Sequence, residues 1–238
     1  MKNKFSIYFI LMLPLLSFAQ INTGEIYYQV SIDIEKNIKE IDKKDLSPMV
    51  KMMMRDTYKN TKPVELILYF DKKYSLSRAV LDLDKPDEGV KILEIVSGVK
   101  YEVYTSQSPH QILKSGGSLG NVLVEETLPQ WTLLDETKNI GIYTAYQAQG
   151  YKMVEGSKGI VKRDFIAWYT PEIPVQYGPY LYSGLPGLIL EVQVGEDLVF
   201  KATDITINGD EAVEINIPKY KIITQEEANA KYKSYLKN

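Results

Sequence analysis

The chain has 238 residues, a formal net charge of −3, one histidine and no cysteine. A mildly acidic chain argues against a nucleic-acid partner, because phosphate binding needs a clustered basic face. Without cysteine there is no disulfide or thiolate chemistry, and a single histidine cannot supply the usual zinc ligands. A phosphate-cradling glycine loop and a dinucleotide fingerprint are also missing from the sequence, so no metal site and no cofactor are predicted.

Residues 1–19 have the pattern of a secretory signal peptide. A short basic start precedes an apolar run from Phe5 to Leu16, and small residues lead to a cleavage site after Ala19. The apolar run is shorter than the roughly 20 residues that a membrane span needs. We therefore expect an exported mature chain, 20–238, without a membrane span. The periplasm is the predicted location, and secretion is the alternative.

Repeated short apolar runs divided by polar turns predict one β-rich domain over 20–238. Short connections between the runs favour antiparallel hairpins. The expected strands are 25–34, 64–70, 74–81, 90–95, 101–104, 111–114, 121–126, 128–133, 140–148, 160–169, 188–194, 198–207 and 212–217. Helices are expected in 35–60, divided near Pro48, and over 228–236, where Thr224 and Glu227 form a capping-box pattern.

Four methionines, Met49, Met52, Met53 and Met54, lie in the second of the early helices. Methionine is flexible and polarisable, so such a cluster can fill an irregular gap in a core or form an adaptable contact surface. The sequence favours core filling.

A glycine- and proline-rich stretch, Ser183 to Val192, joins an aromatic loop to an apolar strand. Gly184-Leu185-Pro186-Gly187-Leu188-Ile189 resembles the naming motif of the exported GLPGLI family. Preceding segments are similar as well: Trp131, Ile140-Gly141-Ile142-Tyr143, Ala167-Trp168-Tyr169-Thr170, the run from Pro171 to Pro174, and Gly178-Pro179. The resemblance implies an exported β-rich envelope protein and no established biochemical function.

The predicted fold class is α+β. We expect a strongly curved antiparallel sheet, a half-barrel like that of periplasmic lipoprotein carriers, with helices against its concave face and a C-terminal helix. Such a sheet would leave an apolar cleft.

Aromatic residues on stiff backbone make good recognition surfaces, because little entropy is lost when they contact a partner. Such residues gather around the loop that precedes the motif, and ordinary packing at the start of a core strand is the competing interpretation. The candidate ligand- or partner-binding residues are Trp168, Tyr169, Pro171, Pro174, Tyr177, Gly178, Pro179, Tyr180, Tyr182, Gly184, Leu185, Pro186 and Gly187.

No catalytic residue is predicted. His110 is expected to be an ordinary surface histidine, because no Gly-x-Ser-x-Gly elbow supplies a nucleophile. The acidic run Asp82 to Glu88 favours a solvated turn over a calcium loop, because Lys85 and Pro86 interrupt it. We expect a non-catalytic envelope protein that binds an apolar ligand or an outer-membrane or secreted protein. A carboxylate-based hydrolase and a purely structural envelope protein are the alternatives.

Overall fold

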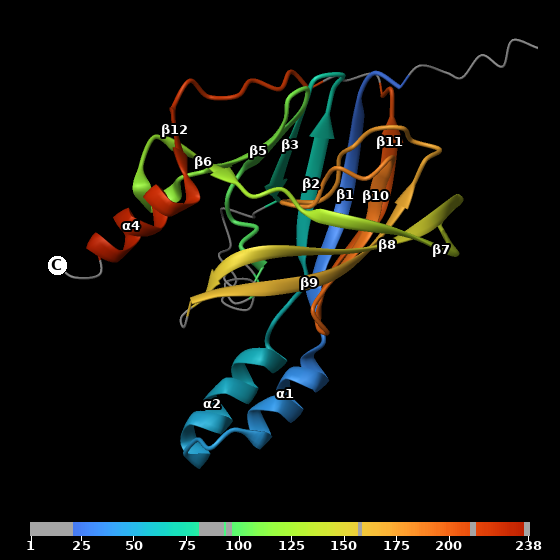
Figure 1. Ribbon diagram of the computed structural model, residues 1–238. Coiled ribbons are helices and arrows are strands. Elements are labelled where there is room, and N and C mark those ends of the chain that lie inside the picture. Colours follow the sequence, from blue (N-terminus) through green and yellow to red (C-terminus); the bar gives the residue numbers. More distant parts are fainter. Residues whose placement is uncertain (1–20, 81–92, 94–96, 157–158, 210–212, 236–238) are drawn as a thin grey trace, which may run out of the picture.

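The computed structural model describes residues 21–80, 93, 97–156, 159–209 and 213–235. They form a 12-stranded, mostly antiparallel sheet in the order β12-β6-β5-β4-β3-β2-β1-β11-β10-β9-β8-β7, and it is not closed (Figure 1). The strands are β1 (Gly24–Ile32), β2 (Val64–Phe70), β3 (Tyr74–Ala79), β4 (Val103–Gln107), β5 (His110–Ser115), β6 (Val122–Glu126), β7 (Gln130–Ile140), β8 (Tyr143–Gly156), β9 (Gly159–Thr170), β10 (Leu188–Val194), β11 (Leu198–Ile207) and β12 (Lys221–Thr224). The helices are α1 (Ile34–Lys43), α2 (Pro48–Lys59), the short 3-10 helix η1 (Gly117–Leu119) and α4 (Gln225–Tyr235).

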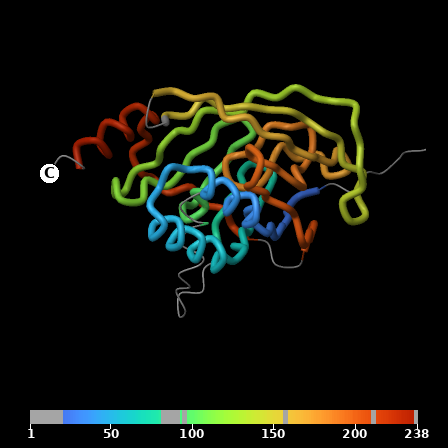
Figure 2. Tube along the Cα trace, turned by 90° about the horizontal axis from the view of Figure 1, so that it is seen from below, coloured from blue at the N-terminus to red at the C-terminus, as the bar shows by residue number. Residues whose placement is uncertain are grey.

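The sheet curls strongly, so that β7, β8 and β9 cross in front of β1 and β2 (Figure 1). Side chains on β1 show which face is inside: Ile26, Tyr28 and Val30 are fully buried, whereas Gln29 between them is exposed. Seen from below, the segment between β9 and β10 lies inside this arc (Figure 2). The predicted curved antiparallel sheet is therefore confirmed in its coarse form.

Helices α1 and α2 form a hairpin beyond the end of the sheet (Figure 1). Its base is held by the turn between β10 and β11, because Asn37 Nδ2 donates to Asp197 Oδ2 at 2.8 Å and Lys36 pairs with Glu196. The prediction that helices cover the concave face is wrong for α1 and α2. The segment between β9 and β10 lies against that face instead.

The break between the two helices falls where Pro48 predicts it. Pro48 is the first residue of α2, and the hydroxyl of Ser47 caps that helix by accepting from Val50 N. Asp33 caps α1 in the same way, accepting from Lys36 N at 2.9 Å. Local capping chemistry thus fixes the hairpin's boundaries.

The convex face carries a second, smaller core. Tyr104 and Leu113 point to this face, and Ile215 from the segment before β12 packs on them. The predicted strand 212–217 is wrong for residues 213–217, which form no strand. The strand of this region is β12, which pairs in parallel with β6.

The capping box before the C-terminal helix is confirmed. Glu227 N donates to Thr224 Oγ1 at 3.1 Å, and Thr224 N donates to Glu227 Oε2 at 2.9 Å. Helix α4 packs beside β12, β6 and η1 at one end of the sheet (Figure 1). Among the helices within the described residues, none is both long and apolar enough to span a membrane.

Three earlier expectations fall wholly or partly outside the described residues. The acidic run 82–88 and the signal peptide 1–19 lie there entirely. The strand expected over 90–95 is wrong where it can be judged, because Leu93 is helical and fully buried in the main core.

Candidate functional site

The predicted aromatic loop is the inner filling of the curled sheet. We call residues 171–187, between β9 and β10, the plug. Of the 13 predicted binding residues, three are exposed, namely Pro171, Pro174 and Pro186, and two are half-buried, namely Trp168 and Gly184. The other eight are buried: Tyr169, Tyr177, Gly178, Pro179, Tyr180, Tyr182, Leu185 and Gly187.

Glycine is required in the plug because neighbouring backbone comes very close. A Cβ on Gly187 would lie 2.2 Å from Thr170 O, and one on Gly178 would lie 2.5 Å from Tyr182 O. Real Cβ atoms do not approach backbone atoms this closely, so any larger residue would push the chain apart. The second glycine of the motif therefore serves packing between the plug and β9.

Hydrogen bonds tie the plug, and the start of β10 that follows it, to other strands of the sheet. Tyr28 Oη on β1 donates to Ile189 O at 2.6 Å, at the start of β10. On β3, Ser77 Oγ accepts from Tyr180 N at 3.0 Å. Tyr180 has a φ of 53°, which is uncommon for a non-glycine residue, and this bond helps to hold it there.

Ser183 lies between opposite ends of the sheet. Its Oγ is 3.0 Å from His110 Nε2 on β5, and its carbonyl accepts from Trp131 Nε1 on β7 at 2.9 Å. Ser183 is buried and His110 is half-buried, and burial lowers the pKa of His110. The prediction of an ordinary surface histidine is thus wrong in placement, because His110 fastens the plug to β5. The tertiary contact left no local signal in the sequence.

Aromatic rings continue this connection through the core. Trp131 meets Phe165 edge-on at 5.0 Å between ring centroids, and Phe165 meets Tyr182 of the plug at the same distance. Tyr182 in turn contacts Phe200 of β11 at 5.6 Å. Such pairs stabilise a core by about 1 kcal/mol each beyond area burial, so the plug is part of the main core.

A cluster of charged side chains lies at the border of this core. Lys152 of β8 is 6% exposed, and its ammonium has no hydrogen-bond partner among the described residues. Glu126 Oε2, at the end of β6, is 3.9 Å away, and Glu126 also pairs with Lys114 of β5. Burial lowers the pKa of Lys152 to about 8, even though Glu126 acts to raise it.

The apolar surface that stands out lies on the α1–α2 hairpin. We call Leu46, Met49, Val50, Met52 and Met53 the methionine tip, because they lie at and after the turn that joins the two helices. Met49, Met52 and Met53 are 69%, 55% and 59% exposed, and α2 has no buried residue. The interpretation that the methionines fill a core gap is wrong for Met49, Met52 and Met53, because α2 packs on α1 beyond the end of the sheet; Met54 is half-buried.

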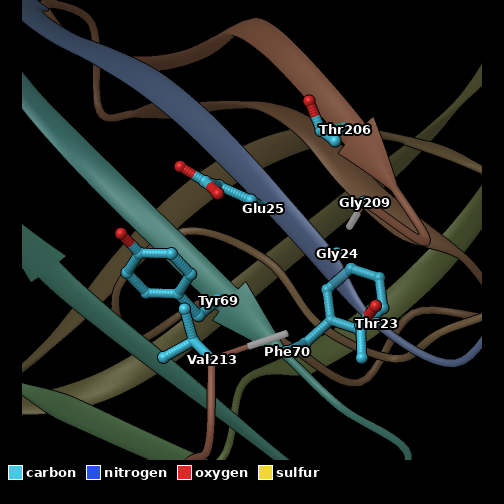
Figure 3. Close-up of a pocket in the computed structure, with 8 residues that line it drawn as sticks. All are labelled: Thr23, Gly24, Glu25, Tyr69, Phe70, Thr206, Gly209 and Val213. Atoms are coloured by element: carbon cyan, nitrogen blue, oxygen red, sulfur yellow. The ribbon is translucent and has the colours of Figure 1, made fainter. Parts of the chain in front are cut away.

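Two small cavities lie among the described residues. One of about 40 Å³ is at the base of the hairpin, beside Ile32 and Leu93. The other, of about 20 Å³, is at the ends of β1, β2 and β11 (Figure 3). Beside it, Glu25 accepts from Tyr27 Oη at 2.7 Å, which raises the pKa of Tyr27 to about 12. Cavities of this size hold a water molecule or two.

Among the described residues, no group of three or more His, Cys, Asp or Glu side chains could hold a metal ion. Among the acidic side chains that form the ion pairs found in the described residues, Glu126 and Glu191 are the least exposed. Glu126 is paired with Lys114, and Glu191 is paired with Lys138. Lys138 also lies 4.3 Å from the centre of the Trp168 ring, so this predicted site residue makes a cation–π contact within the protein.

Comparison with known proteins supports the fold more than a function. A family model described as a protein of unknown function, Porph_ging, matches residues 157–191, which include the whole of β9, the plug and the start of β10. None of the curated proteins matches the sequence.

The solved structures of PNGF-II resemble this fold. In its C2 crystal form, PNGF-II has a TM-score of 0.52 and 14% sequence identity to this chain, and in the P21 form the TM-score is 0.50 at the same identity. Both alignments cover 88% of this chain and 32% of PNGF-II, so the chain spans about a third of that protein's length. At this identity the likeness is one of fold alone.

Proposed function

We propose that the chain is an exported, non-catalytic protein of the cell envelope that binds an outer-membrane or secreted protein through its methionine tip. The observation that carries this proposal is the exposure of Met49, Met52 and Met53 on a helical hairpin that stands away from the sheet (Figure 1). Folding alone gives no reason for these side chains to be apolar. Flexible methionines suit a surface that adapts to a partner.

Charge on the hairpin indicates the chemistry of the partner. Residues 34–59 contain seven Lys and Arg against five Asp and Glu, a net charge of +2, whereas the whole chain carries −3. A basic hairpin with an apolar end fits a partner surface that is apolar in the centre and acidic at its rim. Opposite charges at a rim speed association and set orientation.

The burial of the plug favours a protein partner over an apolar small molecule. A carrier-like half-barrel would offer its concave face to the ligand, but here Tyr177, Leu185 and Leu188 occupy the inside of the curl. An apolar ligand would have to displace part of the main core. The plug and sheet are better understood as a rigid scaffold that presents the hairpin.

Replacement of Met49, Met52 and Met53 by Gln tests this proposal. Gln has a similar length and helix propensity, so the helix should persist while its apolar surface is lost. The tagged variant and wild type are expressed with export, cross-linked in cells and recovered from the envelope. We expect wild type to retain a discrete protein that the triple variant loses.

Met153→Gln is the matched control, because Met153 is an exposed methionine on β8, away from the hairpin. It should retain the same protein at wild-type yield, and circular dichroism should be unchanged in both variants. Equal recovery of that protein with the triple variant would refute the proposed role of the tip.

A further inference from the structure

Lys152 is a buried lysine whose positive charge is not needed to hold the fold together. Its side chain projects from β8 toward Glu126 of β6, which lies on the opposite limb of the curled sheet, and it finds no hydrogen-bond acceptor among the described residues. An ammonium has three donors. Methionine would fill a similar volume without this unmet need.

The nearby carboxylate of Glu126 does not accept a hydrogen bond from Lys152. Glu126 is 10% exposed on its side chain and is paired with Lys114, while its Oε2 stays 3.9 Å from Lys152 Nζ. Arg163, which faces Lys152 across the β8–β9 pairing, adds a further positive charge. Lys152 therefore has two other cations, Lys114 and Arg163, and one carboxylate, Glu126, close enough to act on its charge, and the cluster has an excess of positive charge.

The three cationic side chains of the cluster differ in how far they are exposed to solvent. Lys152 is almost fully buried, Lys114 is 20% exposed, and Arg163 is exposed. Burial raises the pKa of the Tyr180 phenol of the plug, and the negative charge of Glu126 adds to this rise. Cations arranged from surface to interior attract an anion inward, and a poorly hydrated inner charge holds it.

We infer that Lys152, with Lys114 and Arg163 around it, forms a binding site for the anionic group, carboxylate or phosphate, of a small ligand. The anion would accept the hydrogen bonds that Lys152 lacks and would offset the excess positive charge. This site is separate from the methionine tip, so it does not depend on the proposed protein partner.

Inorganic phosphate and acetate are suitable probes, because they carry the two candidate groups and nothing else. The full mature chain is labelled with ¹³C at lysine, and the Lys152 Cε signal is followed at pH 7 during titration with each anion, with chloride at equal ionic strength as reference. We expect a saturating shift of the Lys152 signal with at least one probe and none with chloride. At ten times the Kd, the folded-to-unfolded ratio should rise about elevenfold in thermal unfolding.

Variants distinguish a specific site from general salt effects. Lys152→Met should abolish the stabilisation by the anion, whereas Lys162→Met, an exposed lysine of neighbouring β9, should keep it. A response to phosphate but not acetate would assign a phosphate-bearing ligand, and the reverse a carboxylate. The inference is overturned if wild-type Lys152 shifts with neither probe, or if Lys152→Met is stabilised as much as wild type. If Lys152→Met does not fold, the titration of wild type with phosphate and acetate still tests the inference by itself.

Discussion

Replacing Lys152 with methionine should stabilise the protein at neutral pH. The substitution keeps a long unbranched side chain on β8 but removes an ammonium that is buried without a hydrogen bond. Glu126 keeps its pairing with Lys114, so no buried carboxylate loses its last partner. If Lys152 instead formed a stabilising ion pair with Glu126, its removal would destabilise the fold. The sign of the change in stability therefore shows whether the buried ammonium is unpaired or paired.

The magnitude follows from the pKa of Lys152. Burial lowers this pKa from 10.5 to about 8, so below pH 8 the folded state carries the full cost of the buried charge. At 1.36 kcal/mol for each tenfold change, that cost is about 3 kcal/mol at pH 7. Between pH 8 and 10.5 the unfolded chain binds more protons than the folded one, so the stability of wild type rises with pH. The cost should fall to about 1 kcal/mol at pH 10.

Urea unfolding of wild type and Lys152→Met at pH 7, 8, 9 and 10 measures this difference in the free energy of unfolding. Other titrating groups cancel because both chains contain them, and packing differences add an offset that does not change with pH. We expect the variant's advantage to shrink by about 2 kcal/mol across the range, whereas Lys162→Met should show no such trend. A pH-independent difference, or a variant that is less stable at every pH, would refute the reasoning.

Other substitutions test the plug and the C-terminal cap. Gly187→Ala should cost about 3 kcal/mol or more in urea unfolding, because its Cβ would press on a backbone carbonyl, and Gly209→Ala, which meets only a side-chain methyl at 3.1 Å, should cost far less. Ser183→Ala should cost about 1–2 kcal/mol, because it removes the buried hydroxyl that contacts the histidine of β5; an unchanged stability would contradict that role. Thr224→Ala should cost about 1 kcal/mol through loss of the cap, with Thr224→Ser largely restoring it.

Local features of the fold could be predicted from the sequence because local physics decides them. Alternation marked β1, the turn 195–197 marked the hairpin of β10 and β11, and Pro48 marked the start of α2. The capping box at Thr224 was predicted down to its two hydrogen bonds.

Long-range pairing could not be predicted in this way. Strand β1 lies between β2 and β11, from distant parts of the chain, and alternation reports which face is buried but not which neighbour pairs. β12 is only four residues long and pairs in parallel with β6, so it has too little pattern to be recognised.

The candidate site shows the same limit. Glycines, prolines and aromatics in 171–187 are compatible with an exposed recognition loop and with a buried plug, and the curl of a sheet built from other segments decides between them. For Met52 and Met53 the outcome is reversed. The sequence favoured a place in the core, and the structure leaves both side chains on the surface. The sequence placed Lys152 beyond the expected strand 140–148, and it gave no hint of an unpaired buried charge, which only the approach of β6 to β8 creates.

Site-specific photo-cross-linking in cells tests the central functional claim most directly. A photoreactive phenylalanine is placed at Met53, on the methionine tip, or at Pro174, one of the exposed residues of the plug. Recognition through the tip predicts a discrete cross-linked protein from position 53 and none from position 174. A cross-linked product from position 174 alone would show that the partner binds at the plug, and it would contradict the proposal.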